Sequence, residues 1–297
     1  MWELGIQVGY EKDEKKLREK LETLVNLGYK FAFLSLFNEE EKRLATDEEL
    51  EKYSKVIEEY LIPYTTHALF LTGEPDKPAE SILPYQEEIL YKASILGVKC
   101  ITYHFGLCEG IREGEDFALE KCLNRYNVSV EDFKKLNIYV LKEICNRAKK
   151  YSLTVTIENL PAGCLCDFGT TVLDLLKIIK EVDEENLGIC FDSGHANISG
   201  LNIYEEIIKA GKYLKETHFH DNIGRICDKN IINDMHQPVG IGNINWIKVI
   251  FALEKIEYKF PVDFEISSDL ETAEINIKNW KKFLEIWKDR FPQFQME

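Results

Sequence analysis

Residues 152–194, "SLTVTIENLPAGCLCDFGTTVLDLLKIIKEVDEENLGICFDSG", contain a predicted strand, a predicted helix and a second predicted strand in succession. The runs "SLTVTIEN" (152–159) and "LGICFDSG" (187–194) are short and largely apolar, as buried strands are. Between them, "TTVLDLLKIIKEV" (170–182) has apolar residues at helical spacing. A helix that joins two buried strands is typical of a parallel sheet with covering helices.

The same alternation extends along the chain in both directions. Strands are predicted at 4–10, 29–37, 62–70, 98–106, 152–159, 187–194, 214–221 and 261–267, and helices at 13–28, 46–61, 79–97, 130–150, 170–182, 202–211, 245–256 and 270–289. Eight such units in 297 residues favour an α/β fold of the closed (β/α)8 TIM barrel type, with an open doubly wound sheet as the alternative. Because composition does not shift along the chain, residues 1–297 are expected to form a single domain.

Composition limits the classes of partner. The net charge of −15 without a basic cluster argues against nonspecific binding to a phosphate backbone. No apolar run has membrane length, so no membrane partner and a cytoplasmic location are expected. The eight cysteines lack Cys-x-x-Cys spacing and are expected to be reduced thiols rather than a zinc site.

Polar side chains recur where the predicted strands end. Because successive strand residues point to opposite faces, Glu158 is expected to face the barrel interior. The same parity turns inward His67, His104, Asp192, His218, His220 and Glu265. His195 and His236 follow the sixth and seventh strands, so all six histidines lie at the carboxyl end of the barrel, where active sites form.

Buried imidazoles and carboxylates that converge in this way need a compensating positive charge. We therefore expect a divalent metal ion, bound by His, Asp and Glu without a clear thiolate ligand. These ligands suit Zn, Mn, Co or Fe, and also Mg.

Five segments, "TIEN", "CFDSGHAN", "HFHDNIG", "DMHQPVGIGNINW" and "FEIS", resemble in this order the xylose isomerase-like TIM barrel superfamily. That superfamily includes sugar-phosphate isomerases and epimerases and the endonuclease IV-type AP endonucleases. In the epimerases one metal is held by four residues, which match Glu158, Asp192, His218 and Glu265 here. The resemblance also implies that Glu158 and Glu265 are the catalytic acid/base pair and that His195 lies near the substrate.

The endonuclease members bind three metal ions through nine ligands, and this chain can supply all nine. The additional ligands would be His67, His104, His195, Asp234 and His236. The epimerase resemblance implies one metal ion per chain, which is the favoured expectation. The endonuclease resemblance sets the upper bound at three. His220 and Asp221 are expected to orient the ligands.

The surroundings of the ligands favour the isomerase reading. "DSGHAN" (192–197) is more similar to the sugar isomerase form, and the loop "NEEEKRLATDEE" (38–49) is mostly acidic where a DNA-binding loop would carry basic groups. The expected substrate is a small carbohydrate, and DNA is the partner only under the endonuclease alternative. Lyase or dehydratase chemistry and a barrel that only binds a ligand remain open, as does a homo-oligomer.

Overall fold

A nearly closed ring of strands forms the centre of the molecule, in a computed structural model that describes residues 2–106, 123–161, 169–224 and 234–292. Within those residues an eight-stranded sheet has the order β10-β1-β2-β5-β6-β7-β8-β9, with parallel pairing throughout. Its strands are β1 (Leu4–Val8), β2 (Phe31–Leu34), β5 (Ile62–Phe70), β6 (Cys100–His104), β7 (Thr154–Glu158), β8 (Leu187–Asp192), β9 (Leu214–His218) and β10 (Val262–Phe264). Near the seam between β9 and β10, Phe219 N donates to Asp263 O at 3.0 Å, so the barrel is nearly closed.

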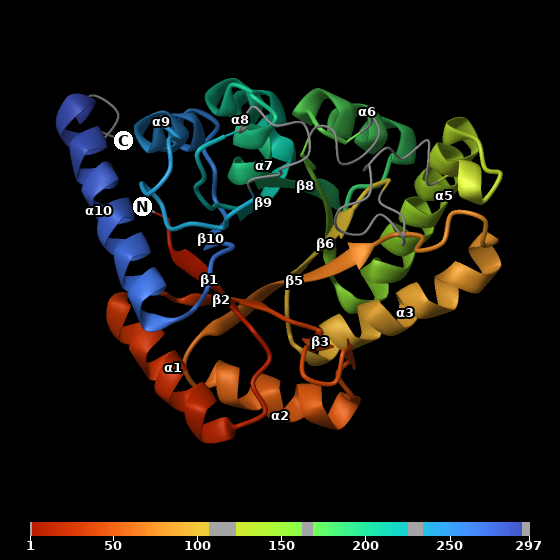
Figure 1. Ribbon diagram of the computed structural model, residues 1–297, viewed down its shortest axis with the longest axis horizontal. Helices are drawn as coiled ribbons and strands as arrows, with labels where there is room; N and C mark the ends of the chain where they lie inside the picture. Colours follow the sequence, from red (N-terminus) through yellow and green to blue (C-terminus); the bar gives the residue numbers. More distant parts are fainter. Residues whose placement is uncertain (1, 107–122, 162–168, 225–233, 293–297) are drawn as a thin grey trace.

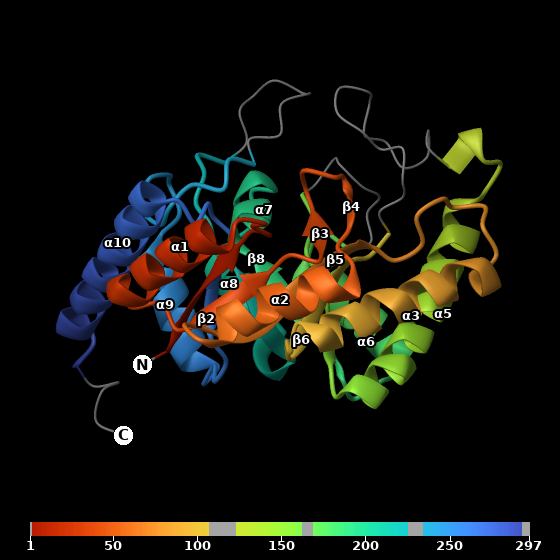
Figure 2. The same cartoon turned by 90° about the horizontal axis from the view of Figure 1, so that it is seen from below.

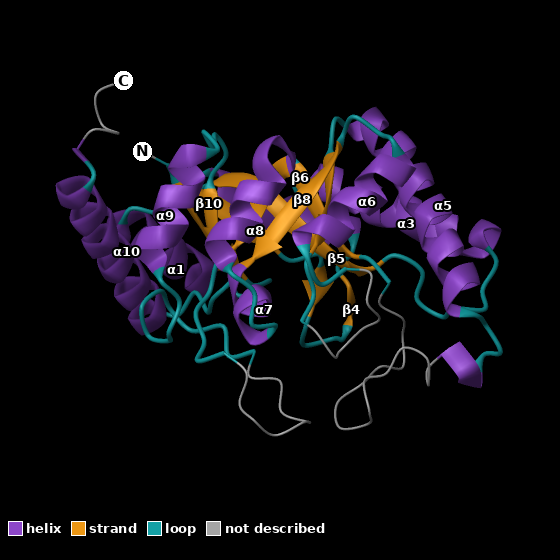
Figure 3. Cartoon of the chain, turned by 90° about the horizontal axis from the view of Figure 1, so that it is seen from above, coloured by secondary structure: helices purple, strands orange, loops and turns teal. Residues whose placement is uncertain are grey.

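Helices surround this ring (Figure 1). They are α1 (Glu14–Leu27), α2 (Asp47–Glu58), α3 (Ala79–Ile95), α5 (Val130–Ala148), α6 (Val172–Val182), α8 (Ile203–Ala210), α9 (Trp246–Lys255) and α10 (Leu270–Arg290). The predicted TIM barrel of eight strand–helix units is confirmed, with element bounds that differ by a few residues. Coloured by secondary structure, the strands lie inside the helical layer (Figure 3).

Two short features were not predicted. The strand expected at 29–37 ends at Leu34, because Ser35 Oγ accepts the amide hydrogen of Phe37 at 3.1 Å and turns the chain. Phe37 then starts a hairpin, β3 (Phe37–Asn38) and β4 (Arg43–Leu44). A short helix, α7 (Ser193–Ile198), directly follows β8. Hairpin and helix lie on the same side of the molecule (Figure 2).

Alternation along the strands separates the apolar layer from the barrel interior, as predicted. Every residue of β8 is buried, with Ile189 and Phe191 in the hydrophobic core. Inside the barrel, Thr102 Oγ1 and Thr156 Oγ1 lie 2.8 Å apart, and Tyr64 of β5 donates to the carbonyl of Lys215 at the far strand β9. Side chains thus fill the interior of the barrel below its carboxyl end. The polar side chains of the predicted site lie at the carboxyl ends of the strands.

Candidate metal centre

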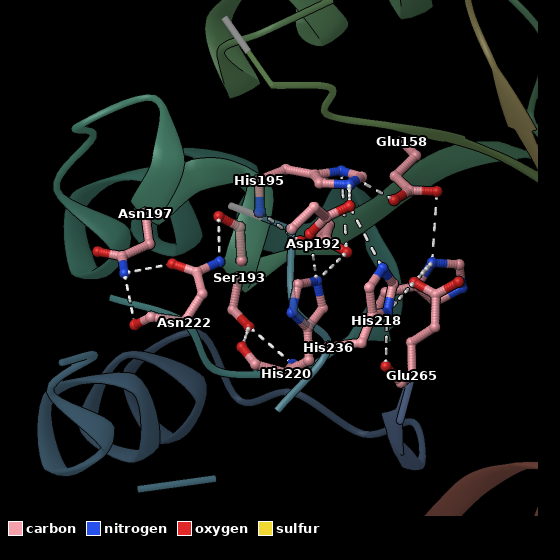
Figure 4. A network of polar contacts seen from close by, with 12 residues as sticks. Glu158, Asp192, Ser193, His195, Asn197, His218, His220, Asn222, His236 and Glu265 are labelled. Atoms are coloured by element: carbon pink, nitrogen blue, oxygen red, sulfur yellow. Dashed lines mark hydrogen bonds and ion pairs between the residues drawn. The ribbon is translucent and has the colours of Figure 1, made fainter. Parts of the chain in front are cut away.

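The carboxyl ends of β5 to β10 bring the predicted site residues to one rim of the barrel (Figure 4). At its centre lie Glu158, Asp192, His218 and Glu265, each with one ligand atom within 4.8 Å of those of the others. Nδ1 of His218 is 3.3 Å from Glu158 Oε2 and 3.2 Å from Glu265 Oε2. We call these four residues the central group.

The His218 imidazole is held in place by packing rather than by hydrogen bonds. Phe33 stacks on it, with ring centroids 4.9 Å apart and planes 12° from parallel. Its two nitrogens are buried, and no described residue forms a hydrogen bond of good geometry with either. A buried imidazole that lacks a hydrogen bond of good geometry and lies between two carboxylates fits a divalent cation as the group that would satisfy all three.

Two further histidines meet Glu158 from the neighbouring strands. Nε2 of His67 and Nε2 of His104 lie 3.0 and 3.2 Å from Glu158 Oε2, and their ring centroids are 4.5 Å apart. The three side chains form a second cluster with metal-ligand spacing, which we call the flanking group. Glu158 belongs to both groups.

Asp234 and His236 reach the rim from the loop after β9. Asp234 Oδ2 lies 3.2 Å from His195 Nε2 and 3.3 Å from His236 Nε2. His236 has a φ of 44°, a left-handed conformation uncommon for a residue with a side chain, and its Nδ1 is 2.8 Å from the carbonyl of Glu265. The loop thus turns both side chains toward the strands.

The residue that organises this loop is Asp221. Its Oδ1 accepts the amides of Asn222 (2.9 Å) and Ile244 (3.2 Å), and its Oδ2 accepts the amide of Gly240 and Trp246 Nε1, both at 2.8 Å. A side chain at Gly242 would overlap the Asp221 carboxylate. Asp221 therefore holds the loop that carries His236, and its predicted part in orienting the ligands stays a prediction.

His195 and Asp192 are joined by the short helix α7. The Asp192 carboxylate caps the helix by accepting the His195 amide at 2.6 Å, and it also belongs to the central group. His195 Nδ1 lies 2.8 Å from the carbonyl of Asn159 and 3.2 Å from Glu158 Oε1. If Nδ1 carries the ring hydrogen and donates it to the Asn159 carbonyl, Nε2 directs its lone pair toward Asp234.

The charges of the rim are strongly coupled. Burial would raise the pKa of Glu158, but the imidazoles of His218 and His104 hold it well below its usual value. For Glu265 the same opposition leaves a pKa of about 2, because His218 outweighs burial. Burial lowers the pKa of His236, but its bond to Asp234 and the charge of Glu265 raise it to about 10. The carboxylates are thus ionised and favour positive charge beside them.

Cys190 was not predicted as a ligand. Its thiol lies within ligand distance of Glu158 and His218. Phe33 was not predicted either, because no sequence signal distinguishes stacking from core packing. Of the eight cysteines, Cys100, Cys145 and Cys190 are buried free thiols, and the other five lie outside the described residues.

Solved structures with this fold include sugar epimerases. A D-tagatose 3-epimerase-like protein has a TM-score of 0.71 at 23% identity, covering 98% of this chain and 99% of that one. An L-ribulose 3-epimerase has a TM-score of 0.71 at 15% identity, covering 99% of this chain and 96% of that one. Likeness at this identity establishes the fold.

Curated relatives carry different names. "Uncharacterized protein MJ1311" of Methanocaldococcus jannaschii is 34% identical over 158 residues, which is 52% of this chain and 50% of that protein. The match thus spans half of that relative. "Probable endonuclease 4" of Sulfurihydrogenibium sp. is 24% identical over 250 residues, covering 80% of this chain and 84% of that protein.

Two findings apply to the chain as a whole. None of the helices in the described part of the chain is both long enough and apolar enough to span a bilayer. The family model described as xylose isomerase-like TIM barrel matches residues 21–289. This chain therefore belongs to the xylose isomerase-like TIM barrel family.

Proposed function

We propose that this protein is a divalent-metal-dependent epimerase or isomerase of a small ketose or ketose phosphate. One observation carries the proposal: two glutamates, Glu158 and Glu265, place carboxylate oxygens 3.3 and 3.2 Å from the same nitrogen of His218. Transfer of a carbon-bound proton requires two carboxyl groups around one binding position, one ionised to accept the proton and the other protonated to return one. The likeness to epimerase structures supports the same fold for this chemistry.

The central group would hold the metal ion, through Glu158, Asp192, His218 and Glu265. Bound there, a divalent cation supplies Lewis acidity that makes the hydrogen beside a ketose carbonyl easier to remove. One glutamate would take that proton as a base while the electron pair moves toward the carbonyl oxygen. The other, which must enter this step in its protonated form, would deliver its proton to the opposite face of the same carbon, so that the configuration inverts and the two glutamates exchange protonation states.

His195 is suited to position the substrate. It is buried and contacts Glu158 through Nδ1, while its Nε2 faces the loop residue Asp234. A hydroxyl group of a sugar bound at this rim could exchange hydrogen bonds with that nitrogen. His218 outweighs burial and lowers the pKa of both glutamates, so the one that acts as the base is ionised, and the one that acts as the acid must take up a proton before the step.

The hairpin at the rim favours a small carbohydrate over DNA. Arg43 is bonded to Glu41 and to Glu49, at 2.8 Å from Glu41 Oε2 through Nε and 2.9 Å from Glu49 Oε2 through Nη1. Lys12 also lies 3.3 Å from Glu41. These cations are neutralised by their neighbours, and so they offer little attraction to a phosphate backbone.

A specific observation supports a second candidate, a metal-dependent phosphodiesterase of the endonuclease type. The flanking group of His67, His104 and Glu158, together with Asp234 between His195 and His236, provides the larger ligand set. Several metal ions at such positions would activate water and stabilise a phosphate in transit. The relatives named endonuclease 4 support this candidate as well.

Solvent isotope exchange tests the proposal. The metal-loaded protein is incubated in D2O with each ketohexose, ketopentose and matching ketose phosphate, and deuterium at the epimerised carbon is measured by mass spectrometry. We expect incorporation by the wild type and a loss of at least 100-fold in Glu158→Gln and in Glu265→Gln. Glu206→Gln is the matched control, because Glu206 is buried but bonds to Val172 and Lys209 outside the site.

An abasic-site DNA duplex is assayed beside the sugars with the same four proteins. Cleavage of that duplex without deuterium incorporation in any sugar would replace the first candidate by the second. Incorporation that survives in both glutamine variants would contradict the assigned acid/base pair.

A further inference from the structure

A cavity of about 580 Å³ lies at the amino ends of three neighbouring strands, β10, β1 and β2. Trp2 and Glu3 precede β1, Phe31 begins β2, and residues 258–261 precede β10. This volume is within the range of about 300–1,000 Å³ that is typical of small-molecule sites. We propose that the cavity, which we call the amino-end site, binds a small aliphatic diammonium ion. It lies at the opposite end of the strands from the central group, and the proposal does not depend on the reaction proposed above.

Four aromatic residues form much of the wall of the amino-end site. Trp2, Phe31 and Phe260 are half-buried, so part of each side chain stays open to a ligand. Trp2 is fixed by its indole, whose Nε1 donates to the carbonyl of Tyr258 at 2.7 Å, and the rings of Tyr258 and Phe260 lie 5.7 Å apart. Methylene groups pack against such rings, and the ring faces attract cations. The wall therefore suits an alkyl chain that carries positive charge.

The charged residues of the amino-end site are mostly acidic, and they are Glu3, Glu254, Glu257 and Lys259. Glu3 pairs with Lys30, whereas no described residue forms an ion pair with Glu254 or Glu257. These two glutamates are one turn apart, because the Glu257 amide donates to the Glu254 carbonyl at 2.9 Å. Like charges at this spacing repel each other. A ligand with two ammonium groups would compensate both carboxylates.

The protein already holds an ammonium group of its own against this wall. Lys215 Nζ lies over the ring of Phe260, 5.1 Å from its centroid, which is within the distance of a cation–π contact. Lys215 is not among the residues that line the cavity, so Trp2 and Phe31 remain for a ligand. The same kind of contact is therefore available to an ammonium group that enters from solvent.

A further carboxyl group lies behind the inner wall. A β-carbon added at Gly5 would be 1.4 Å from Asp263 Oδ1 and 3.3 Å from the β-carbon of Phe31, so the Asp263 carboxyl group lies close behind Phe31. Asp263 is fully buried, and no described residue donates a hydrogen bond of good geometry to either of its oxygens. Because water screens a buried charge little, this group adds to the attraction of a cation in the amino-end site.

Tryptophan indole signals locate the bound ion. The chain has four tryptophans, of which Trp246, Trp280 and Trp287 are buried and Trp2 lines the amino-end site. The full-length protein, labelled with 15N in tryptophan, is titrated with 1,4-diaminobutane at pH 7.5, and the Trp2 signal is assigned by its loss in Trp2→Phe. We expect a saturable shift of this signal alone. Butane-1,4-diol, the neutral isostere, and Mg2+, a dication without methylene groups, should each leave it unchanged.

Variants that remove charge test the two glutamates. In the double variant Glu254→Gln and Glu257→Gln the Kd for 1,4-diaminobutane should rise about 10-fold, and each single variant should give part of that rise. Glu285→Gln is the matched control, because it removes the same charge from an exposed position of α10 outside the cavity and should leave the Kd unchanged. Phe31→Leu keeps an apolar side chain but removes the ring, and it should raise the Kd about 2–5-fold.

The three buried indole signals check that each variant is folded, and the single variants decide the matter if the double variant does not fold. Absence of a saturable Trp2 shift in the wild type would overturn the proposal, as would an equal response to the diol or to Mg2+, or an unchanged Kd in the glutamine variants. A shift of Trp246 instead of Trp2 would overturn it too, because Trp246 bonds to Asp221 in the loop at the metal-binding rim. None of these results bears on the isotope-exchange test, since no turnover is measured.

Discussion

Replacing Asp221 by asparagine should destabilise the fold far more than a change of one atom suggests. The carboxylate accepts four hydrogen bonds, two on each oxygen, from Asn222, Gly240, Ile244 and the Trp246 indole. In Asp221→Asn one oxygen becomes an NH2 group, which faces two N–H donors and can accept from neither. A buried donor without an acceptor costs about 1–3 kcal/mol, so the free energy of unfolding should fall by about 2–6 kcal/mol.

Urea denaturation of the metal-free protein, followed by circular dichroism, measures this loss. Asp183→Asn is the matched control: Asp183 is exposed at the end of α6 in a left-handed conformation that asparagine also adopts, and its replacement should change stability by less than about 0.5 kcal/mol. A loss below about 1 kcal/mol in Asp221→Asn would refute the reasoning.

A double-mutant cycle with Trp246→Phe tests the same contact from its other side. In the wild type this change removes a hydrogen bond of 2.8 Å, whereas in Asp221→Asn it removes an unsatisfied donor. Its cost should therefore be smaller in the variant, by about 0.5–3 kcal/mol. Strictly additive effects would show that the indole and the carboxylate are not coupled.

Two more stability predictions concern the barrel interior and a helix end. Burial and the charge of Asp263 raise the pKa of Glu216, and burial raises the pKa of Asp263 to about 6. The contribution of these two groups to the free energy of unfolding is therefore fully present below about pH 4, and it is lost as pH rises through 6. Glu216→Gln should lessen that loss, measured as the difference in the free energy of unfolding in urea between pH 7.5 and pH 5, and an unchanged pH dependence would contradict the prediction. Thr171→Ala removes the side chain that accepts the Asp174 amide at the start of α6 and should cost about 1 kcal/mol. Thr23→Ala should cost nothing measurable, because the Thr23 hydroxyl donates only an exposed hydrogen bond to the Glu19 carbonyl within α1; equal effects of the two changes would exclude the cap as the cause.

The order of the elements and the facing of the strand residues could be predicted because both follow from periodicity. Residues at alternate positions of a strand must share a face, so Glu158 and His104 were expected inside the barrel before any contact was known. In the structure they pair across β6 and β7 and lie 3.2 Å apart. For Glu158 and His104, a polar side chain at an inward-facing strand position was sufficient to predict that the residue belongs to the site.

The short elements and the loop contacts could not be predicted, because they depend on single hydrogen bonds rather than on periodic patterns. Helix α7 has six residues, too few for a helical repeat, and it starts where the carboxylate of Asp192 accepts one amide. Three of the partners of Asp221 could not be predicted either, because Gly240, Ile244 and Trp246 lie 19 to 25 positions further along the chain. Hydrogen bonds between a side chain and backbone amides far along the chain cannot be recognised from the residue types, because every residue except proline has such an amide.

The capping of α7 by Asp192 has a thermodynamic consequence. One oxygen of this carboxylate closes the first turn of the helix, and the other faces His220. Any ligand that fixes the carboxylate in this orientation also stabilises the helical turn, and the turn in its formed state presents the carboxylate to the ligand. The two equilibria are reciprocal, so hydrogen exchange of the His195 amide should slow when a cation is added and should report binding even without turnover.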